Sequence, residues 1–141
     1  MNEKSKAPLV MLEQMVMLLV FALAAALCLQ AFVKSDAASR ESEARDRAVN
    51  LCQSVAEVLR TNGGDADGAI NQVLGEHPVL PLPLKADMTP AAAVEETAYY
   101  LEVVPLNDGI PGLAGALVRI ATPDWAEFFS LDVMWQEEVA A

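Results

Sequence analysis

Met15–Leu29 reads MVMLLVFALAAALCL, fifteen residues without a polar side chain. If the three flanking polar residues are admitted, the apolar stretch grows to 25 residues, from Leu9 to Val33. A helix of that length measures about 37 Å, which is enough to cross the hydrocarbon core of a bilayer with some tilt. The stretch contains no Gly or Pro, and a helix satisfies its own backbone hydrogen bonds in lipid. The sequence therefore predicts a transmembrane helix over residues 9–33.

Two cleavable membrane signals fit this stretch less well than a retained anchor. A secretory signal ends at a small-x-small site, which Ala22–Ala24 and Ala24–Ala26 satisfy formally. The apolar sequence nevertheless continues to Val33, beyond the end of a typical signal core. A lipoprotein signal would modify Cys28, but Leu27 precedes it where a small residue is needed. We therefore expect the helix to be retained as a membrane anchor in contact with lipid.

The middle of the predicted span contains a cluster of small side chains, which affects how the helix can pack against other helices. Small residues allow membrane helices to approach one another closely. Such a cluster suits contact between subunits, and it is equally compatible with an ordinary single anchor. The cluster consists of Ala22, Ala24, Ala25 and Ala26.

The charges that flank the span give conflicting indications of its orientation. Counting only Lys and Arg would place the longer C-terminal side in the cytoplasm, since four of these residues lie in 34–47 and two in 1–8. Four acidic residues offset the cations of 34–47, whereas only Glu3 offsets the N-terminal pair. We expect residues 1–8 to be a short cytoplasmic leader-like segment of a single-pass protein of the cell membrane. The C-terminal domain would then lie outside the cytoplasm.

Residues 34–61 predict that the helix continues beyond the membrane. They contain no Pro or Gly, and the pairs Arg40/Glu43 and Glu41/Arg45 stand at helical spacing. Apolar residues then recur at steps of three and four, a stripe that requires a partner surface. The stripe is formed by Ala48, Leu51, Cys52, Val55, Val58 and Leu59. Asn62-Gly63-Gly64 predicts the end of the helix.

The two cysteines cannot form a disulfide within one such helix. Cys28 and Cys52 are 24 residues apart, which corresponds to about 36 Å along a helix axis. A disulfide requires Cα atoms within about 7 Å of each other. Both are interpreted as small apolar packing residues.

Residues 62–141 predict a small acidic α+β head domain. Asp65 or Asp67 would cap a short helix that runs to about Leu74. The Asp-x-Asp-Gly sequence does not match a calcium loop, since Gly68 stands fourth rather than sixth. Three prolines then predict an extended connection over residues 77–84.

Three runs with strand character follow, over Ala98–Leu106, Leu113–Ala121 and Glu127–Gln136. Short connections between them favour an antiparallel meander, with a turn at Asn107–Gly109. In the last run one face is apolar and would point inward: Phe129, Leu131, Val133 and Trp135. The predicted fold class is α+β, a long N-terminal helix packed against a small antiparallel sheet of about three strands. The stripe of residues 48–59 would cover the sheet.

The charge of the chain excludes several functions. Residues 62–141 hold thirteen acidic and two basic residues, so the net charge of −11 is concentrated there. Such a domain suits neither nucleic acid nor anionic lipid headgroups. The single histidine, His77, has no Ser or Cys nearby, and the acidic pairs are more simply solvated charges or caps. We expect no enzymatic activity, no cofactor and no metal.

Leu9-Val10-Met11-Leu12-Glu13-Gln14-Met15-Val16, followed by the apolar residues 17–33, resembles the N-terminus of type IV pilins and type II secretion pseudopilins. The similarity in sequence covers roughly residues 4–60, and for the head it lies in the architecture. The absence of an intrachain disulfide suits a minor subunit. The resemblance implies a filament subunit whose partners are other pilin-like subunits or assembly-platform proteins.

The same resemblance assigns roles to a few residues near the N-terminus. Glu13 is fifth if Leu9 is the first mature residue, and it would set the axial register by pairing with a neighbour's amino terminus. A leader would be cleaved near Ala7, Pro8 and Leu9, although Pro8 stands where the peptidase usually has Gly or Ala. A simpler alternative is that Glu13 reaches water at the membrane surface. The whole protein would then be a single-pass anchor whose outer domain binds a partner without polymerising.

Overall fold

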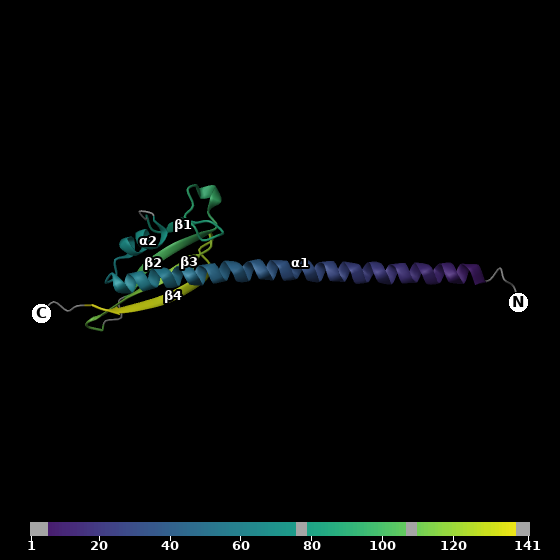
Figure 1. The fold of residues 1–141 in the computed structure, drawn as a ribbon, viewed down its shortest axis with the longest axis horizontal. Helices are drawn as coiled ribbons and strands as arrows, with labels where there is room; N and C mark the ends of the chain where they lie inside the picture. Colours follow the sequence, from purple (N-terminus) through teal and green to yellow (C-terminus); the bar gives the residue numbers. More distant parts are fainter. Residues whose placement is uncertain (1–5, 76–78, 107–109, 138–141) are drawn as a thin grey trace. The chain divides into compact units, whose positions relative to one another are not determined.

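The computed structural model describes residues 6–75, 79–106 and 110–137, with side chains from Pro8 onward. Helix α1 spans Lys6–Thr61, and its 56 residues confirm the prediction of one long helix (Figure 1). The chain divides into two compact units, with the boundary between Glu41 and Ser42. The predicted turn at Asn107–Gly109 and the lone His77 lie outside the described residues.

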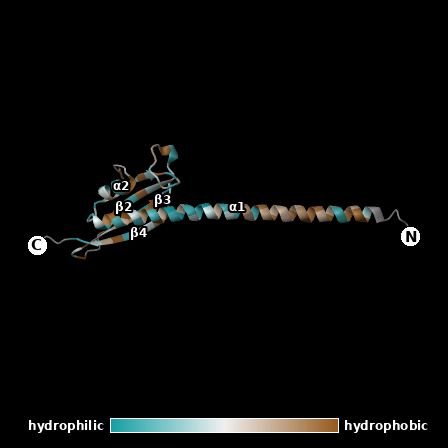
Figure 2. Ribbon diagram, in the orientation of Figure 1, coloured by the Kyte–Doolittle hydropathy of each residue, from teal (hydrophilic) through white to brown (hydrophobic). Residues whose placement is uncertain are grey.

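The first unit consists of the N-terminal part of α1. Every described side chain from Pro8 to Val33 is exposed, and Figure 2 shows this part as predominantly hydrophobic. Among the described residues, α1 is the one helix that is long and apolar enough to cross a membrane. Exposed hydrophobic side chains on all sides of a helix are stable in lipid and unstable in water. This part of α1 is therefore built for an apolar surrounding.

The second unit contains the end of α1, helix α2 at Ala66–Leu74 and a four-stranded sheet. The sheet order follows the chain, and every neighbouring pair of strands is antiparallel. The strands are β1 at Leu82–Leu84, β2 at Tyr99–Leu106, β3 at Leu113–Ala121 and β4 at Glu127–Gln136. The predicted meander of β2, β3 and β4 is confirmed. The predicted α+β fold, with a sheet of about three strands, is confirmed with one strand more, because β1 precedes the meander.

Strand β1 was hidden in the sequence by prolines. Leu82 and Leu84 are buried on the core face, and Pro83 between them faces away from it, which is the alternation of a strand. Proline has no N–H to donate, and in strands it is found mainly where no neighbouring strand needs that N–H, as at a sheet edge. β1 pairs with β2 along its length, and beyond that it forms an isolated bridge between Leu84 and Pro90, with no further strand beside it among the described residues. The missing N–H of Pro83 therefore costs no ladder hydrogen bond to a further strand. The residues expected to form a simple extended connection therefore form a fourth strand.

The core of the second unit lies between α1 and α2 on one side and the inner face of the sheet on the other. Five of the six stripe residues of α1 are buried, and Val58 is partly buried against the same core. Ala69 and Ile70 of α2 are fully buried beside them. The sheet contributes alternate residues, among them Leu101, Val118 and Ile120, all completely buried. Burial of one such side chain stabilises the fold by about 1.5–3 kcal/mol.

The end of α1 is fixed by two consecutive glycines. The N–H of Gly64 donates to the carbonyl of Leu59 at 2.8 Å, five residues back, as in a Schellman motif. Gly63 and Gly64 both have left-handed φ values, of 65° and 91°. A Cβ atom on Gly63 would meet nothing within 4 Å, whereas one on Gly64 would overlap the indole of Trp135. The chain therefore turns out of the helix against a side chain of β4.

This contact predicts different effects for two neighbouring substitutions. Gly63→Ala should lower the free energy of unfolding by about 1 kcal/mol, the strain of a left-handed alanine. Gly64→Ala adds the overlap with Trp135 and should lower it by about 2–4 kcal/mol. Urea unfolding of the full chain in detergent, followed by Trp fluorescence, gives both values. Equal effects of the two substitutions would show that Trp135 does not pack on Gly64.

Candidate functional site

The residues assigned to membrane assembly lie along the exposed part of α1. Glu13 is exposed, as are Ala22, Ala24, Ala25 and Ala26, and the span presents these side chains without any cover from the described chain. Pro8 and Leu9 lie in the first turns of α1 and are also exposed. The side chain of Ala7 lies outside the described set. The span is thus a continuous apolar surface that carries one carboxylate near its start.

The polar segment after the span carries ion pairs, although they differ from those expected. Arg40 pairs with Asp36 at 3.0 Å and Arg47 with Glu43 at 3.5 Å, both four residues back along the helix. The pairs Arg40/Glu43 and Glu41/Arg45 are not among the ion pairs of the described residues. Helical side chains lean toward the N-terminus, which places Arg40 over Asp36 rather than Glu43. All these groups are exposed, so each pair contributes only a few tenths of a kcal/mol.

The residues assigned to packing between helix and sheet all join the core. Ala48, Cys52, Val55 and Leu59 have no exposed surface, and Val133 of β4 is buried opposite them. The other residues of β4 in this set are partly buried against the same cluster: Phe129, Leu131 and Trp135. Phe128 also packs on this side, because a register shift between Ile120 and Ala121 adds a residue to β4. The packing surface between α1 and the sheet is therefore already covered within the chain.

Cys52 is chemically protected in this core. Burial raises the pKa of its thiol from 9.0 to about 12, so the reactive thiolate is suppressed at neutral pH. Cys28, in contrast, is exposed on the apolar span. The two free cysteines therefore differ in accessibility, and neither is paired in the chain.

The buried thiol predicts a loss of stability at alkaline pH. Because the folded pKa of about 12 lies above the unfolded value of 9.0, the stabilisation is complete below pH 9 and disappears between pH 9 and 12. Relative to Cys52→Ala, the native chain should lose about 2 kcal/mol between pH 8 and pH 10.5. Urea unfolding of both proteins at the two pH values measures this difference. Parallel pH profiles would mean that Cys52 ionises freely.

The outer face of the sheet is the second uncovered surface of the molecule. Leu101, Val118 and Ile120 point inward, so their neighbours Tyr100, Glu102 and Arg119 point outward. Glu102 and Arg119 are directly opposite in the register and form an ion pair, with Nε donating to Oε2 at 3.1 Å. The outer face also carries apolar side chains, namely Val104, Leu117 and Met134.

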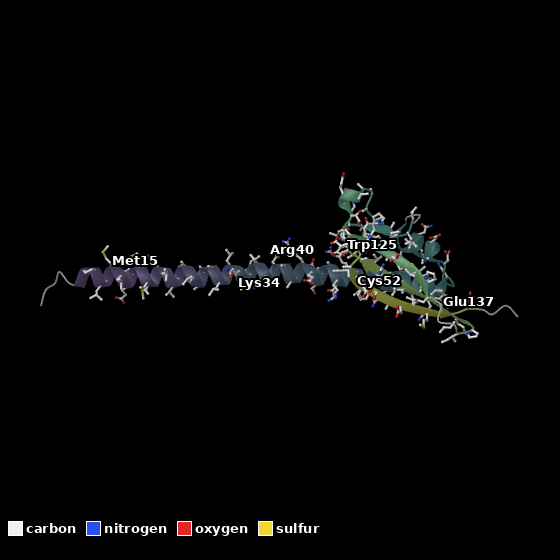
Figure 3. The ribbon with its side chains drawn as sticks, turned by 180° about the vertical axis from the view of Figure 1, so that it is seen from behind. Met15, Lys34, Arg40, Cys52, Trp125 and Glu137 are labelled. Carbon is white, nitrogen blue, oxygen red and sulfur yellow. The ribbon has the colours of Figure 1, made fainter. Side chains whose placement is uncertain are left out.

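An aromatic pair stands at one end of this outer face. The rings of Tyr100 and Trp125 lie nearly parallel, with centroids 5.3 Å apart and an interplanar angle of 12°. Trp125 belongs to the turn between β3 and β4, and Figure 3 shows it at the opposite end of β4 from Glu137. The sequence did not predict this pair. The turn residues 122–124 predict that the chain reverses, but they do not predict where the side chain of Trp125 lies.

A groove of about 650 Å³ lies at the other end of the second unit. It is lined by residues around the end of α1 and the ends of β2, β3 and β4, including Gly64, Leu106, Leu113 and Trp135. Among the described residues, Glu137 is the one charged group that lines it, and no Ser, Thr, Cys, Lys or His side chain lies beside that carboxylate. A shallow apolar groove with one carboxylate lacks the paired groups that acid–base or nucleophilic chemistry needs.

The described residues hold no group of three or more His, Cys, Asp or Glu side chains that could bind a metal. Asp65 acts as the N-cap of α2, and its carboxylate accepts from the N–H of Gly68 at 3.1 Å. This confirms the capping role predicted for the Asp-x-Asp-Gly sequence.

No protein-family model matches the chain, and no curated protein or solved structure is significantly similar to it.

Proposed function

We propose that the protein is a non-enzymatic, pseudopilin-like minor subunit of a filament of the type IV pilus or type II secretion kind. The observation that carries the proposal is helix α1, whose first half is an uncovered apolar surface and whose last turns pack on an antiparallel sheet. One helix thus joins a membrane-compatible stem to a folded head. The stem would hold the subunit in the cell membrane, with the N-terminus in the cytoplasm and the head outside.

Assembly would bury the apolar stems of many subunits against one another. Each stem offers the same surface, and heterologous contacts between identical subunits that do not close into a ring generate a filament. The alanine cluster at residues 22–26 permits close approach of neighbouring helices. A carboxylate within an apolar span is expensive to leave unpaired, so Glu13 would form an ion pair with the amino terminus of a neighbour. That pair would set the axial step between subunits.

Removal of the Glu13 charge tests this mechanism. Glu13→Gln should reduce filament formation at least about tenfold, since it removes an ion pair in an apolar environment, while membrane insertion is unchanged or improved. Glu41→Gln is the matched control, because Glu41 lies on the same helix beyond the span and should assemble normally. Cross-linking of Cys28 with a membrane-permeant bis-maleimide, whose spacer bridges the stagger between neighbouring stems, measures assembly in native membranes, and alkaline extraction measures insertion. Normal cross-linking of Glu13→Gln would contradict the assembly role.

Leader processing gives a second, independent test. If a prepilin-type peptidase acts on this chain, the protein purified from its own membranes should begin at Pro8 or Leu9. N-methylation of the new terminus would add 14 Da, the mass of one CH₂ group. Intact-mass measurement and N-terminal sequencing decide the question. A chain that begins at Met1 would contradict processing and favour a permanent anchor.

The second candidate function is a single-pass anchor whose head binds a partner without polymerising. It is favoured by the position of Glu13, four residues inside the apolar stretch, where the carboxylate can reach water at the membrane surface. The uncovered outer face of the sheet would then be the working surface. Normal insertion together with no Cys28 cross-linking in the unaltered protein supports this alternative.

A further inference from the structure

The turn between β3 and β4 holds Trp125 in a conformation that side chains rarely adopt. Its φ is +62°, in the left-handed region, where a residue with a Cβ is strained by about 1–2 kcal/mol. Three hydrogen bonds fix the turn around it. The N–H of Trp125 donates to the Thr122 carbonyl at 2.8 Å, and the Thr122 N–H and hydroxyl donate to the Ala126 carbonyl at 2.9 and 3.3 Å.

Burial in the core does not compensate for the backbone strain at Trp125. Its side chain is 50% exposed, and neither Trp125 nor Tyr100 belongs to the hydrophobic cluster between helix and sheet. The tyrosine ring instead supports the indole from one side, in a nearly parallel stack on the outer face. The turn therefore presents a large aromatic side chain to the surroundings in a fixed orientation.

Near this aromatic pair, the basic residues Arg119 and Lys85 are both held in ion pairs, whereas two nearby acidic residues are not. Asp124 precedes Trp125, and Glu127 lies in the same cross-strand row as Tyr100, through Ala121. Asp124 and Glu127 are exposed, and neither takes part in an ion pair among the described residues. Arg119, the cation of this sheet face, is held by two hydrogen bonds to Glu102.

We propose that the Trp125–Tyr100 pair, with Asp124 and Glu127, binds an arginine side chain of a partner protein. A guanidinium is planar, stacks on an indole face and donates to carboxylates through a fork of N–H groups. A half-exposed indole with exposed carboxylates one residue before it and two residues after it in the chain offers both kinds of contact. The negative charge of the head, which repels acidic surfaces, attracts such a basic partner and guides its approach.

An arginine suits this site better than the other cationic side chain. The ammonium of lysine is compact and strongly hydrated, whereas a guanidinium loses less hydration when it lies flat on a ring. The site does not depend on stem assembly, since all its residues belong to the second unit. The binding inference and the filament proposal can therefore fail separately.

The test uses the full chain in detergent micelles with ¹⁵N-labelled indole groups. The two tryptophans give two indole signals, which Trp125→Phe assigns, and Trp135 serves as the internal reference. Acetyl-arginine-amide should shift the Trp125 signal with half-saturation at about 10 mM. This is the affinity expected of a single cation–π contact beside a carboxylate. Acetyl-citrulline-amide, a neutral analogue of the same shape, should shift it at least about fivefold less at equal concentration.

Charge variants complete the design. Glu127→Gln and Asp124→Asn should each weaken arginine-amide binding by about threefold, and their combination by about tenfold. Asp67→Asn is the matched control, because it removes one exposed carboxylate from α2, on the core side of the sheet, and should leave binding unchanged. Equal shifts with the citrulline analogue, an equal loss in Asp67→Asn, or no saturable shift would overturn the proposal. A saturable shift with glucose and none with arginine-amide would also overturn it and assign the ring pair to carbohydrate.

Discussion

The packing of the stripe of α1 on the inner face of the sheet is the contact on which the rest of the head depends. A sheet with one apolar face is not stable in water until that face is covered. The buried face of α1 includes the small residues Ala48 and Cys52 of the stripe and also Ala56, and small side chains let a helix lie close to the strands. α2 extends the cover with Ala69 and Ile70, and the glycines after Thr61 turn the chain toward it. Sheet, cover and connection are therefore interdependent.

The two halves of α1 differ in where their apolar side chains are buried. The stripe of residues 48–59 buries most of its apolar surface within the chain. The stretch from Leu9 to Val33 remains exposed, with none of its side chains covered by the described residues. The polar segment between them has as many basic as acidic residues, and two ion pairs along the helix hold four of these eight charges. One continuous element therefore combines a surface for lipid or other stems with a surface for the sheet. This combination is what the filament proposal uses.

Patterns of period two and period 3.6 were sufficient to predict most of the fold. The long helix, its end at the glycines, α2 and three of the four strands follow from such patterns, because burial repeats with the geometry of each element. β1 was missed because Pro83 outweighed the alternation of Leu82 and Leu84. The residues of the core were predictable for the same reason as the elements. The Tyr100–Trp125 pair was not, because the two rings are brought together by strand register and a left-handed φ that no local pattern encodes.

The two edges of the sheet are unequal in their capacity for further growth. β1 is three residues long and contains a proline, so that edge offers few free backbone groups and lacks one N–H. β4 is ten residues long, lies at the opposite edge and has no proline. Any intermolecular strand pairing, in a concentrated or heated sample, is therefore directed to β4. Its exposed Asp132 and Glu127 act as charged gatekeepers there, and they provide an electrostatic barrier against aggregation through that edge.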